Sequence, residues 1–174
     1  WPRGIAARGE VRGQYAHVVD IAPTILAALG LEAPAQLNGV AQRPLEGVSF
    51  AHTFADAAAP TRKRVQYYEM IASRALWADG WKAVVEQPQG GPLDEALLAK
   101  QRWELYHVAE DFSECADLAA THPGKLAELI ERWWVEAGKY NVLPLDSRMQ
   151  TRMSERKPIA AGAQSRYVYY RHGA

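Results

Sequence analysis

The dipeptide Asp79-Gly80 is the feature of this sequence that most restricts how the chain can fold. Asp-Gly is typical of a two-residue β-hairpin turn, because both turn positions need a positive φ. The flanking segments, Arg74–Trp77 and Trp81–Val85, are rich in aromatic and β-branched residues, which favour strands. The sequence therefore predicts that these segments pair as neighbouring antiparallel strands.

Two further segments extend this hairpin into a sheet. Val65–Met70 and Trp103–His107 have the same strand-like composition. Gln87–Gln101 is rich in Pro and Gly and then weakly helical, so it predicts an exposed insertion. Four strands with short connections predict a small antiparallel sheet with one face that needs to be covered.

A long helix over Pro123–Tyr140 is predicted to cover that face. Pro123 suits the first helical position, where no intrahelical donor is lost. Apolar residues then recur with the 3.6-residue period of a helix. They are Leu126, Leu129, Ile130, Trp133, Trp134 and Ala137.

A shorter helix is predicted over Ile21–Leu29. Asp20 is suited to cap it, with its carboxylate accepting from the free N–H groups of the first turn, and Gly30 suits its C-terminal end. The loop from Glu32 to Gly47 is rich in Pro, Gly and Asn, and Ala57–Pro60 is interpreted as a linker.

The composition argues against several classes of protein. Apolar residues make up 48% of the 174 residues, which predicts a packed core. Twenty basic residues balance twenty acidic ones, so nothing indicates a nucleic-acid or membrane partner. The single cysteine, Cys115, excludes an internal disulfide and a multi-cysteine metal site. Both ends of the chain read like the interior of a polypeptide, and the compartment, periplasmic or cytoplasmic, is left open.

His17 is the first candidate for a functional residue. It lies three residues before Asp20, at a junction that leads into the predicted helix. Enzymes with α/β folds place active-site residues beyond the carboxyl ends of strands, which is such a position. The alternative, favoured from the residues alone, is a histidine bonded to a neighbouring backbone carbonyl at a crowded turn.

An acidic group with one imidazole is the second candidate: His107, Glu110, Asp111 and Glu114. Several carboxylates can hold a hard cation, but the twelve-residue loop of an EF-hand is absent. A solvated turn with a side-chain bond at Asp111 is the favoured interpretation. A hydrolase built on this group is the alternative, and it would lose activity in Asp111→Ala. Cys115 has acidic neighbours, which disfavour a thiolate nucleophile.

Aromatic residues and two cations complete the candidates. The rings could form a stacking platform for carbohydrate or nucleic acid, but without a basic surround core packing is favoured. They are Tyr67, Tyr68, Trp77, Trp81 and Trp103. Arg74 and Lys82 are interpreted as solvated cations at strand edges.

The order of these segments resembles the C-terminal part of bacterial arylsulfatases, in the sulfatase family of the alkaline-phosphatase-like superfamily. Seven stretches between Trp1 and about Asp146 carry the resemblance. They are Trp1–Ile5, His17–Gly30, Leu37–Phe50, Gln66–Val84, Trp103–Ala119, His122–Leu129 and Glu136–Asp146. One local departure is Ile71-Ala72-Ser73, where a Gly-Asn-like pair is expected before Arg74.

The resemblance implies a parent enzyme that hydrolyses sulfate esters to an alcohol or phenol plus sulfate. Such enzymes use formylglycine, made from a Cys/Ser-x-Pro-x-Arg motif, and a calcium ion held by Asp and Asn residues. Neither the motif nor these ligand pairs occur here, so both groups are expected upstream of Trp1. The chain alone is expected to be inactive and to bind no calcium. Its expected partners are the remainder of the sulfatase polypeptide and a small-molecule sulfate ester.

The resemblance also divides the chain into three parts. Residues 1–60 would end the large α/β domain, residues 61–146 would form the C-terminal α+β subdomain, and residues 147–174 would lead into a further extension. His17 would lie at the pocket edge, and the loop Asn38–Gly47 would form part of its rim. Without its parent sheet, the helix Ile21–Leu29 would expose apolar surface. The alternative is a non-catalytic interaction or scaffold module derived from a sulfatase C-terminus.

Overall fold

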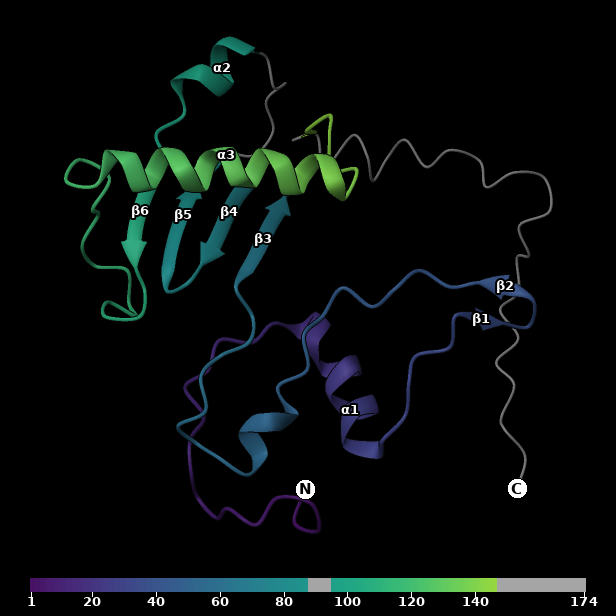
Figure 1. Cartoon of the computed structure of the whole chain (residues 1–174). Helices are drawn as coiled ribbons and strands as arrows, with labels where there is room; N and C mark the ends of the chain where they lie inside the picture. Colours follow the sequence, from purple (N-terminus) through teal and green to yellow (C-terminus); the bar gives the residue numbers. More distant parts are fainter. Residues whose placement is uncertain (88–94, 147–174) are drawn as a thin grey trace, which may run out of the picture.

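A four-stranded antiparallel sheet lies beneath one long helix in the computed structural model, which describes residues 1–87 and 95–146. The strands are β3 (Val65–Met70), β4 (Ser73–Ala78), β5 (Trp81–Val85) and β6 (Glu104–His107), in the order β3-β4-β5-β6. Figure 1 shows helix α3 (Pro123–Lys139) lying across one side of these strands. The predicted α+β architecture, with its covering helix, is confirmed.

The β4–β5 hairpin has the turn that the sequence predicts. Asp79 and Gly80 have φ values of 48° and 88°, and Ala78 pairs with Trp81 across them. Positive φ at both central positions is the backbone of a type I′ turn, whose twist matches that of the strands it joins. This hairpin fixes the register at the centre of the sheet.

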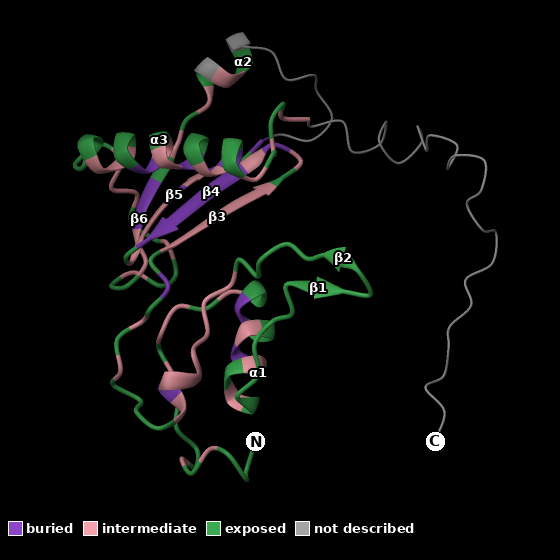
Figure 2. Ribbon diagram, turned by 45° about the vertical axis from the view of Figure 1, so that its right-hand side comes forward, coloured by how far each residue is buried: buried purple, intermediate pink, exposed green. Residues whose placement is uncertain are grey.

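The apolar core fills the space between the sheet and α3. Leu76, Leu105 and Trp133 are fully buried, and Figure 2 shows buried residues along β4, β5 and β6. Trp133 also donates a hydrogen bond from Nε1 to the carbonyl of Tyr68 in β3, at 2.9 Å. The apolar stripe predicted for the long helix therefore forms its packing face, although Trp134 is 38% exposed.

The prediction that Arg74 is a solvated strand-edge cation is wrong. Arg74 is only 3% exposed, and its guanidinium carbon lies 5.0 Å and 5.3 Å from the ring centroids of Trp103 and Trp133. Burial lowers the pKa of its guanidinium group. Because β4 is an inner strand covered by α3, this side chain meets aromatic rings rather than water, and they stabilise its charge through their π faces.

The N-terminal region precedes the sheet and contains short elements. They are the 3-10 turn η1 (Val18–Asp20), helix α1 (Ile21–Leu29), strands β1 (Gln36–Leu37) and β2 (Val40–Ala41), and the 3-10 turn η2 (Ala51–Phe54). Gly30 ends α1 with φ 65°, as predicted. The loop Glu32–Gly47 contains the β1–β2 hairpin, which the sequence did not reveal (Figure 1).

Two further predictions concern α1. The prediction that the Asp20 carboxylate caps the first turn of this helix is wrong, because it makes no capping hydrogen bond there. The prediction of exposed apolar surface is confirmed, since Ile21, Ile25 and Leu29 are 49%, 53% and 61% exposed. Figure 2 shows this exposure along α1 and the neighbouring hairpin.

Some predictions fall outside what the structure tests. The part assigned to residues 147–174 lies outside the described residues, as do residues 88–94 of the insertion Gln87–Gln101, whose end forms helix α2 (Glu95–Lys100). The domain division at residue 60 stays a prediction. Among the described helices, none combines the length and the apolarity needed to cross a bilayer.

The β3–β4 turn has an unfavourable pair of residues. Ile71 and Ala72 have φ values of 54° and 67°, so both occupy the left-handed region. This region costs an L-residue about 1–2 kcal/mol, and it is especially unusual for a β-branched side chain. The departure noted at Ile71-Ala72-Ser73 is therefore a strained turn, held by the strands on both sides.

We predict that Ile71→Asn raises the free energy of unfolding by about 0.5–1 kcal/mol, because Asn tolerates positive φ far better than Ile. Met70→Asn is the matched control, since Met70 is 71% exposed and is the strand residue next to the turn. It removes an apolar side chain without relieving a left-handed residue, so it should not stabilise the fold. Urea unfolding followed by tryptophan fluorescence measures both variants, and destabilisation by Ile71→Asn would contradict the strain argument.

Candidate functional site

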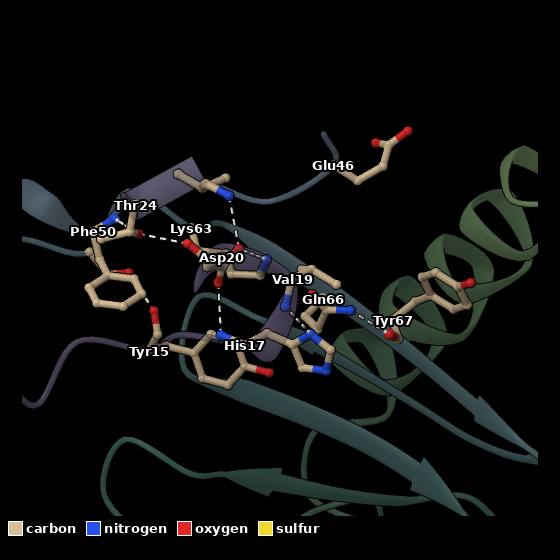
Figure 3. A network of polar contacts seen from close by, with 12 residues as sticks. Tyr15, His17, Val19, Asp20, Thr24, Glu46, Phe50, Lys63, Gln66 and Tyr67 are labelled. Atoms are coloured by element: carbon tan, nitrogen blue, oxygen red, sulfur yellow. Dashed lines mark hydrogen bonds and ion pairs between the residues drawn. The ribbon is translucent and has the colours of Figure 1, made fainter. Parts of the chain in front are cut away.

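A buried carboxylate at the start of α1 organises the candidate site. Asp20 is 1% exposed and accepts hydrogen bonds from the backbone N–H groups of His17, at 2.7 Å, and Val48, at 2.8 Å. Its third donor is the Nζ of Lys63, at 2.7 Å, and this ammonium group is on a residue only 5% exposed. Figure 3 shows these contacts converging on one side chain. Asp20 therefore joins three segments that are distant in the sequence.

These contacts determine the charge state of Asp20. Burial raises the pKa of the carboxyl group, but the hydrogen bond and charge of Lys63 and the two backbone N–H donors lower it. The lowering effects win, so the pKa of Asp20 lies below its ordinary value. Asp20 and Lys63 consequently form a charged pair near neutral pH.

His17 is fixed by the same turn. The ring atom Nδ1 of His17 accepts a hydrogen bond from the backbone N–H of Val19 at 3.4 Å, and the backbone N–H of His17 donates to the Asp20 carboxylate. A neutral imidazole whose Nδ1 accepts carries its proton on Nε2, which can then donate to a ligand. The ring packs edge-on against Tyr68, with centroids 5.3 Å apart. The backbone N–H of His17 donates to the Asp20 carboxylate. The alternative interpretation of His17 as a locally hydrogen-bonded residue is therefore supported, but its partner is a carboxylate rather than a backbone carbonyl.

His17 and Lys63 line a cleft of about 400 Å³ between the N-terminal region and the sheet. Figure 3 shows Val19 from η1, His17 immediately before it, and Gln66 and Tyr67 from β3. The remaining lining residues come from β3, the Asn38–Gly47 loop and the end of α3. They are Val65, Tyr68, Glu69, Glu46, Glu136 and Tyr140. The cleft thus brings together residues from across the chain.

Tyr140 connects the β3 side of the cleft to the Asn38–Gly47 loop. The rings of Tyr67 and Tyr140 stack with centroids 5.1 Å apart, and the Tyr140 hydroxyl donates to Glu46 at 2.9 Å. Glu46 therefore brings the Asn38–Gly47 loop to the edge of the cleft. The chemistry available in the cleft is hydrogen bonding by carboxylates, phenols, one ammonium group, one carboxamide and one imidazole, which suits the binding of a polar ligand.

The acidic group near Asp111 does not converge on one point. His107 Nδ1 lies 3.2 Å from Glu110, whereas Glu114 accepts from Lys82 at 2.7 Å. The Asp111 carboxylate accepts from the backbone N–H of Ala116 at 2.9 Å. These contacts support the interpretation of this segment as a turn, and they pair Lys82 rather than leaving it as a solvated cation.

The aromatic residues pack mainly inside the fold. Trp77 is 5% exposed and stacks on Tyr15 with centroids 3.7 Å apart, and Tyr15 also contacts the Tyr68 hydroxyl. Trp103 packs against Trp133 beneath α3. Core packing between the sheet and α3 is confirmed for Trp103, whereas Trp77 is buried on the other face of the sheet, against Tyr15.

Two residues of the site were missed by sequence reasoning. Lys63 stands in the basic run Arg62-Lys63-Arg64 before a strand, and Tyr140 is the last residue of the predicted long helix. Neither has a local signal, because their partners Asp20 and Glu46 are 43 and 94 residues away. The three-residue spacing of His17 and Asp20 was a usable signal, since this spacing is that of a capping box.

The described residues do not form a metal centre. Within residues 1–87 and 95–146, no three His, Cys, Asp or Glu side chains gather as ligands for a metal ion. The donor set of the described residues therefore does not fit the calcium ion that the resemblance implies. Cys115 is exposed, and its Sγ lies 3.8 Å from the carbonyl of Ser113.

Comparison of the sequence with known proteins identifies a distant relative. No protein-family model matches the chain. An uncharacterized sulfatase of Schizosaccharomyces pombe is 28% identical to it over 136 residues, which are 76% of this chain and 23% of that protein. The chain is therefore related to sulfatases and spans about a quarter of the length of this relative.

Solved structures give partial matches to the fold. One, described under the metabolism of multiple glycosaminoglycans by Bacteroides thetaiotaomicron, is 20% identical, covers 70% of this chain and 24% of its own, and has a TM-score of 0.44. Another, described in complex with its substrate D-glucosamine-2-N,6-O-disulfate, is 19% identical, with coverages of 73% and 25% and a TM-score of 0.46. Those substrates belong to those proteins.

We predict that Lys63→Met lowers the free energy of unfolding by about 3 kcal/mol, because it leaves the Asp20 carboxylate buried without its charge partner. Arg64→Met is the matched control at the next residue. Arg64 is 69% exposed and pairs with Asp79, so its loss should cost less than about 1 kcal/mol. Chemical denaturation of both variants is the measurement, and equal effects would contradict the assigned role of the buried pair.

A second prediction concerns acid. Because the folded pKa of Asp20 is lowered, its contribution to stability is fully present above the unfolded value of about 4 and is lost as the pH falls through the folded value. The urea midpoint of the wild type should therefore fall more between pH 5 and pH 3 than that of Asp20→Asn. Unfolding curves at both pH values measure the difference, and parallel losses in the two proteins would refute a lowered pKa.

Proposed function

We propose that this chain is the C-terminal segment of a sulfatase, of the arylsulfatase type, that hydrolyses sulfate esters to an alcohol or phenol plus sulfate. The observation that carries the proposal is the 28% identity to a sulfatase over 136 residues. A sheet with one covering helix is the arrangement expected for the smaller C-terminal subdomain of such an enzyme. A bacterial source is part of the proposal, although the curated relative is fungal.

The proposal divides the enzyme between this chain and polypeptide upstream of it. The chain contains no Cys/Ser-x-Pro-x-Arg sequence from which formylglycine could be made. The described residues do not fit a calcium site either. We therefore assign the nucleophile and the metal to the upstream polypeptide, and this chain supplies binding and packing surface.

Within this division, we assign His17 to the edge of the substrate pocket. It lines the cleft, and its Nε2 is the nitrogen that carries the proton when Nδ1 accepts from Val19. An N–H group of this kind can donate to an oxygen of a sulfate ester. Glu46 lines the same cleft, and this contact supports the proposal that the Asn38–Gly47 loop forms part of the rim.

The competing function, a non-catalytic interaction or scaffold module, fits the surface less well. A module that stands alone is expected to cover its apolar helices, whereas Ile25 and Leu29 of α1 are more than half exposed. This surface favours a segment of a larger protein.

The test is to express the polypeptide encoded by the complete gene and to assay it with 4-nitrophenyl sulfate, with dodecyl sulfate as an alkyl comparison. We expect hydrolysis of the aryl ester by the complete protein and none by Trp1–Ala174 alone. The control is an Ala substitution of the upstream Cys or Ser in the formylglycine motif, which should abolish hydrolysis. An upstream region without that motif, or hydrolysis that survives the control, would refute the proposal.

A further inference from the structure

The chain has two asparagines, Asn38 and Asn141, whose surroundings differ in one chemical respect. Both are exposed, and both have a positive φ, of 51° and 56°. Asn38 is followed by Gly39, whereas Asn141 is followed by the β-branched Val142. The backbone nitrogen of the following residue is the atom that can attack an asparagine side-chain amide. The freedom of that nitrogen therefore determines how long each carboxamide lasts.

The nitrogen of Gly39 is free to attack. Asn38 and Gly39 form the turn between β1 and β2, across which Leu37 pairs with Val40. Among the described residues, neither the Gly39 backbone N–H nor the Asn38 carboxamide has a hydrogen-bond partner. Gly39 also lies in open space, because a Cβ added to it would meet no atom within 4 Å. Nothing in the described structure therefore hinders the approach of this nitrogen to the Asn38 side chain.

The nitrogen of Val142 is not free. Just past the end of α3, its N–H donates to the carbonyl of Ala137 at 2.9 Å. Its β-branched side chain is stiff and crowds the backbone beside Asn141. Asn141 thus shares the exposure and the left-handed backbone of Asn38 but lacks an available nucleophile, which makes it an internal control.

The β1–β2 hairpin is also able to move. It is a two-stranded sheet with two exposed residues in each strand, and Figure 2 shows its exposure. Such an isolated pair is marginal in water and opens locally at little free-energy cost. The Asp79-Gly80 turn differs, since it belongs to the four-stranded sheet, Asp79 pairs with Arg64 at 2.8 Å and the Gly80 carbonyl accepts from Ala109 at 3.3 Å.

We propose that Asn38-Gly39 is a site of spontaneous deamidation, with water as the only co-reactant. The Gly39 nitrogen loses its proton to solvent and bonds to Cγ of Asn38. The Cγ–Nδ2 bond breaks, and the amide nitrogen takes up a proton and leaves as ammonia. Water then opens the succinimide ring, at the side-chain carbonyl to give aspartate or at the backbone carbonyl to give isoaspartate. No atom changes its oxidation state.

The product changes this loop in two ways. Either isomer adds a negative charge to a chain whose formal net charge is zero at pH 7. Isoaspartate also adds a carbon to the backbone, so the two-residue turn no longer pairs Leu37 with Val40 in register. The same loop continues to Glu46 at the cleft. The inference goes beyond the proposed function and does not depend on it.

The test follows the wild-type protein, both as the present chain and as the polypeptide encoded by the complete gene, at pH 6 and pH 8. Cleavage after glutamate at mildly acidic pH, where ring closure is slow, separates residues 33–46 from a peptide that contains Asn141. Mass spectrometry measures the amide-to-acid change, and isoaspartyl methyltransferase with a labelled methyl donor detects isoaspartate. At pH 8 we expect Asn38 to convert at least tenfold faster than Asn141. Its rate should lie within tenfold of that of the free synthetic peptide 33–46 and should fall at pH 6, because the attacking nitrogen must lose a proton.

Asn38→Gln is the matched control, since its longer side chain must close a larger and less favourable ring. Acid formation and methylation at this position should both fall at least tenfold. Conversion of Asn38 no faster than that of Asn141 would overturn the proposal. So would conversion more than tenfold slower than in the free peptide, in either protein, because the turn would then be protected. The assay with 4-nitrophenyl sulfate tests the proposed function separately.

Discussion

The buried ion pair between Asp20 and Lys63 is the contact on which the placement of the N-terminal region depends. Each charge would cost several kcal/mol to bury alone, so the arrangement holds only while both are present and hydrogen-bonded. Two backbone N–H groups, from His17 and Val48, complete the environment of the carboxylate. Since these donors come from separate segments, one side chain sets the positions of η1, the end of the Asn38–Gly47 loop and the entry to β3. The cleft that contains His17 follows from that placement.

The sheet and α3 depend on a different kind of contact. Their core is apolar and continuous from Leu76 to Trp133 and Ala137, and it encloses the cation of Arg74 among tryptophan rings. Apolar burial is non-directional, so it supplies stability without choosing one partner segment. The ion pair is directional and supplies little net stability, but it distinguishes one arrangement of the two regions from others. The apolar core therefore stabilises the sheet and α3, and the buried ion pair positions the N-terminal region relative to the sheet.

The sequence predicts the parts of this structure that local rules govern. Asp79-Gly80 determines a turn whatever surrounds it, and the apolar period of α3 determines which side of that helix is buried. The candidate site is different. His17 was a candidate from its position before the predicted helix, and a family resemblance pointed to the Asn38–Gly47 loop, whereas Lys63 and Tyr140 are bonded to residues 43 and 94 positions away. Asp20 and Arg74 were misjudged for one reason: each has a plausible local role, and a partner brought by tertiary packing replaces it.

The difference between directional polar contacts and apolar burial explains why the N-terminal region is ordered although its apolar side chains are incompletely covered. Directional polar contacts fix the start of α1 against Val48 and Lys63, so the helix has a defined position before its apolar stripe meets anything. Because Ile21, Ile25 and Leu29 already have defined positions, contact with another surface would need little further ordering of α1, and the entropy cost of that association would be lower. A flexible α1 would lose that advantage, because each exposed side chain would have to be ordered on contact. The buried charges of Asp20 and Lys63 therefore hold α1 in position while its apolar side chains Ile21, Ile25 and Leu29 stay exposed.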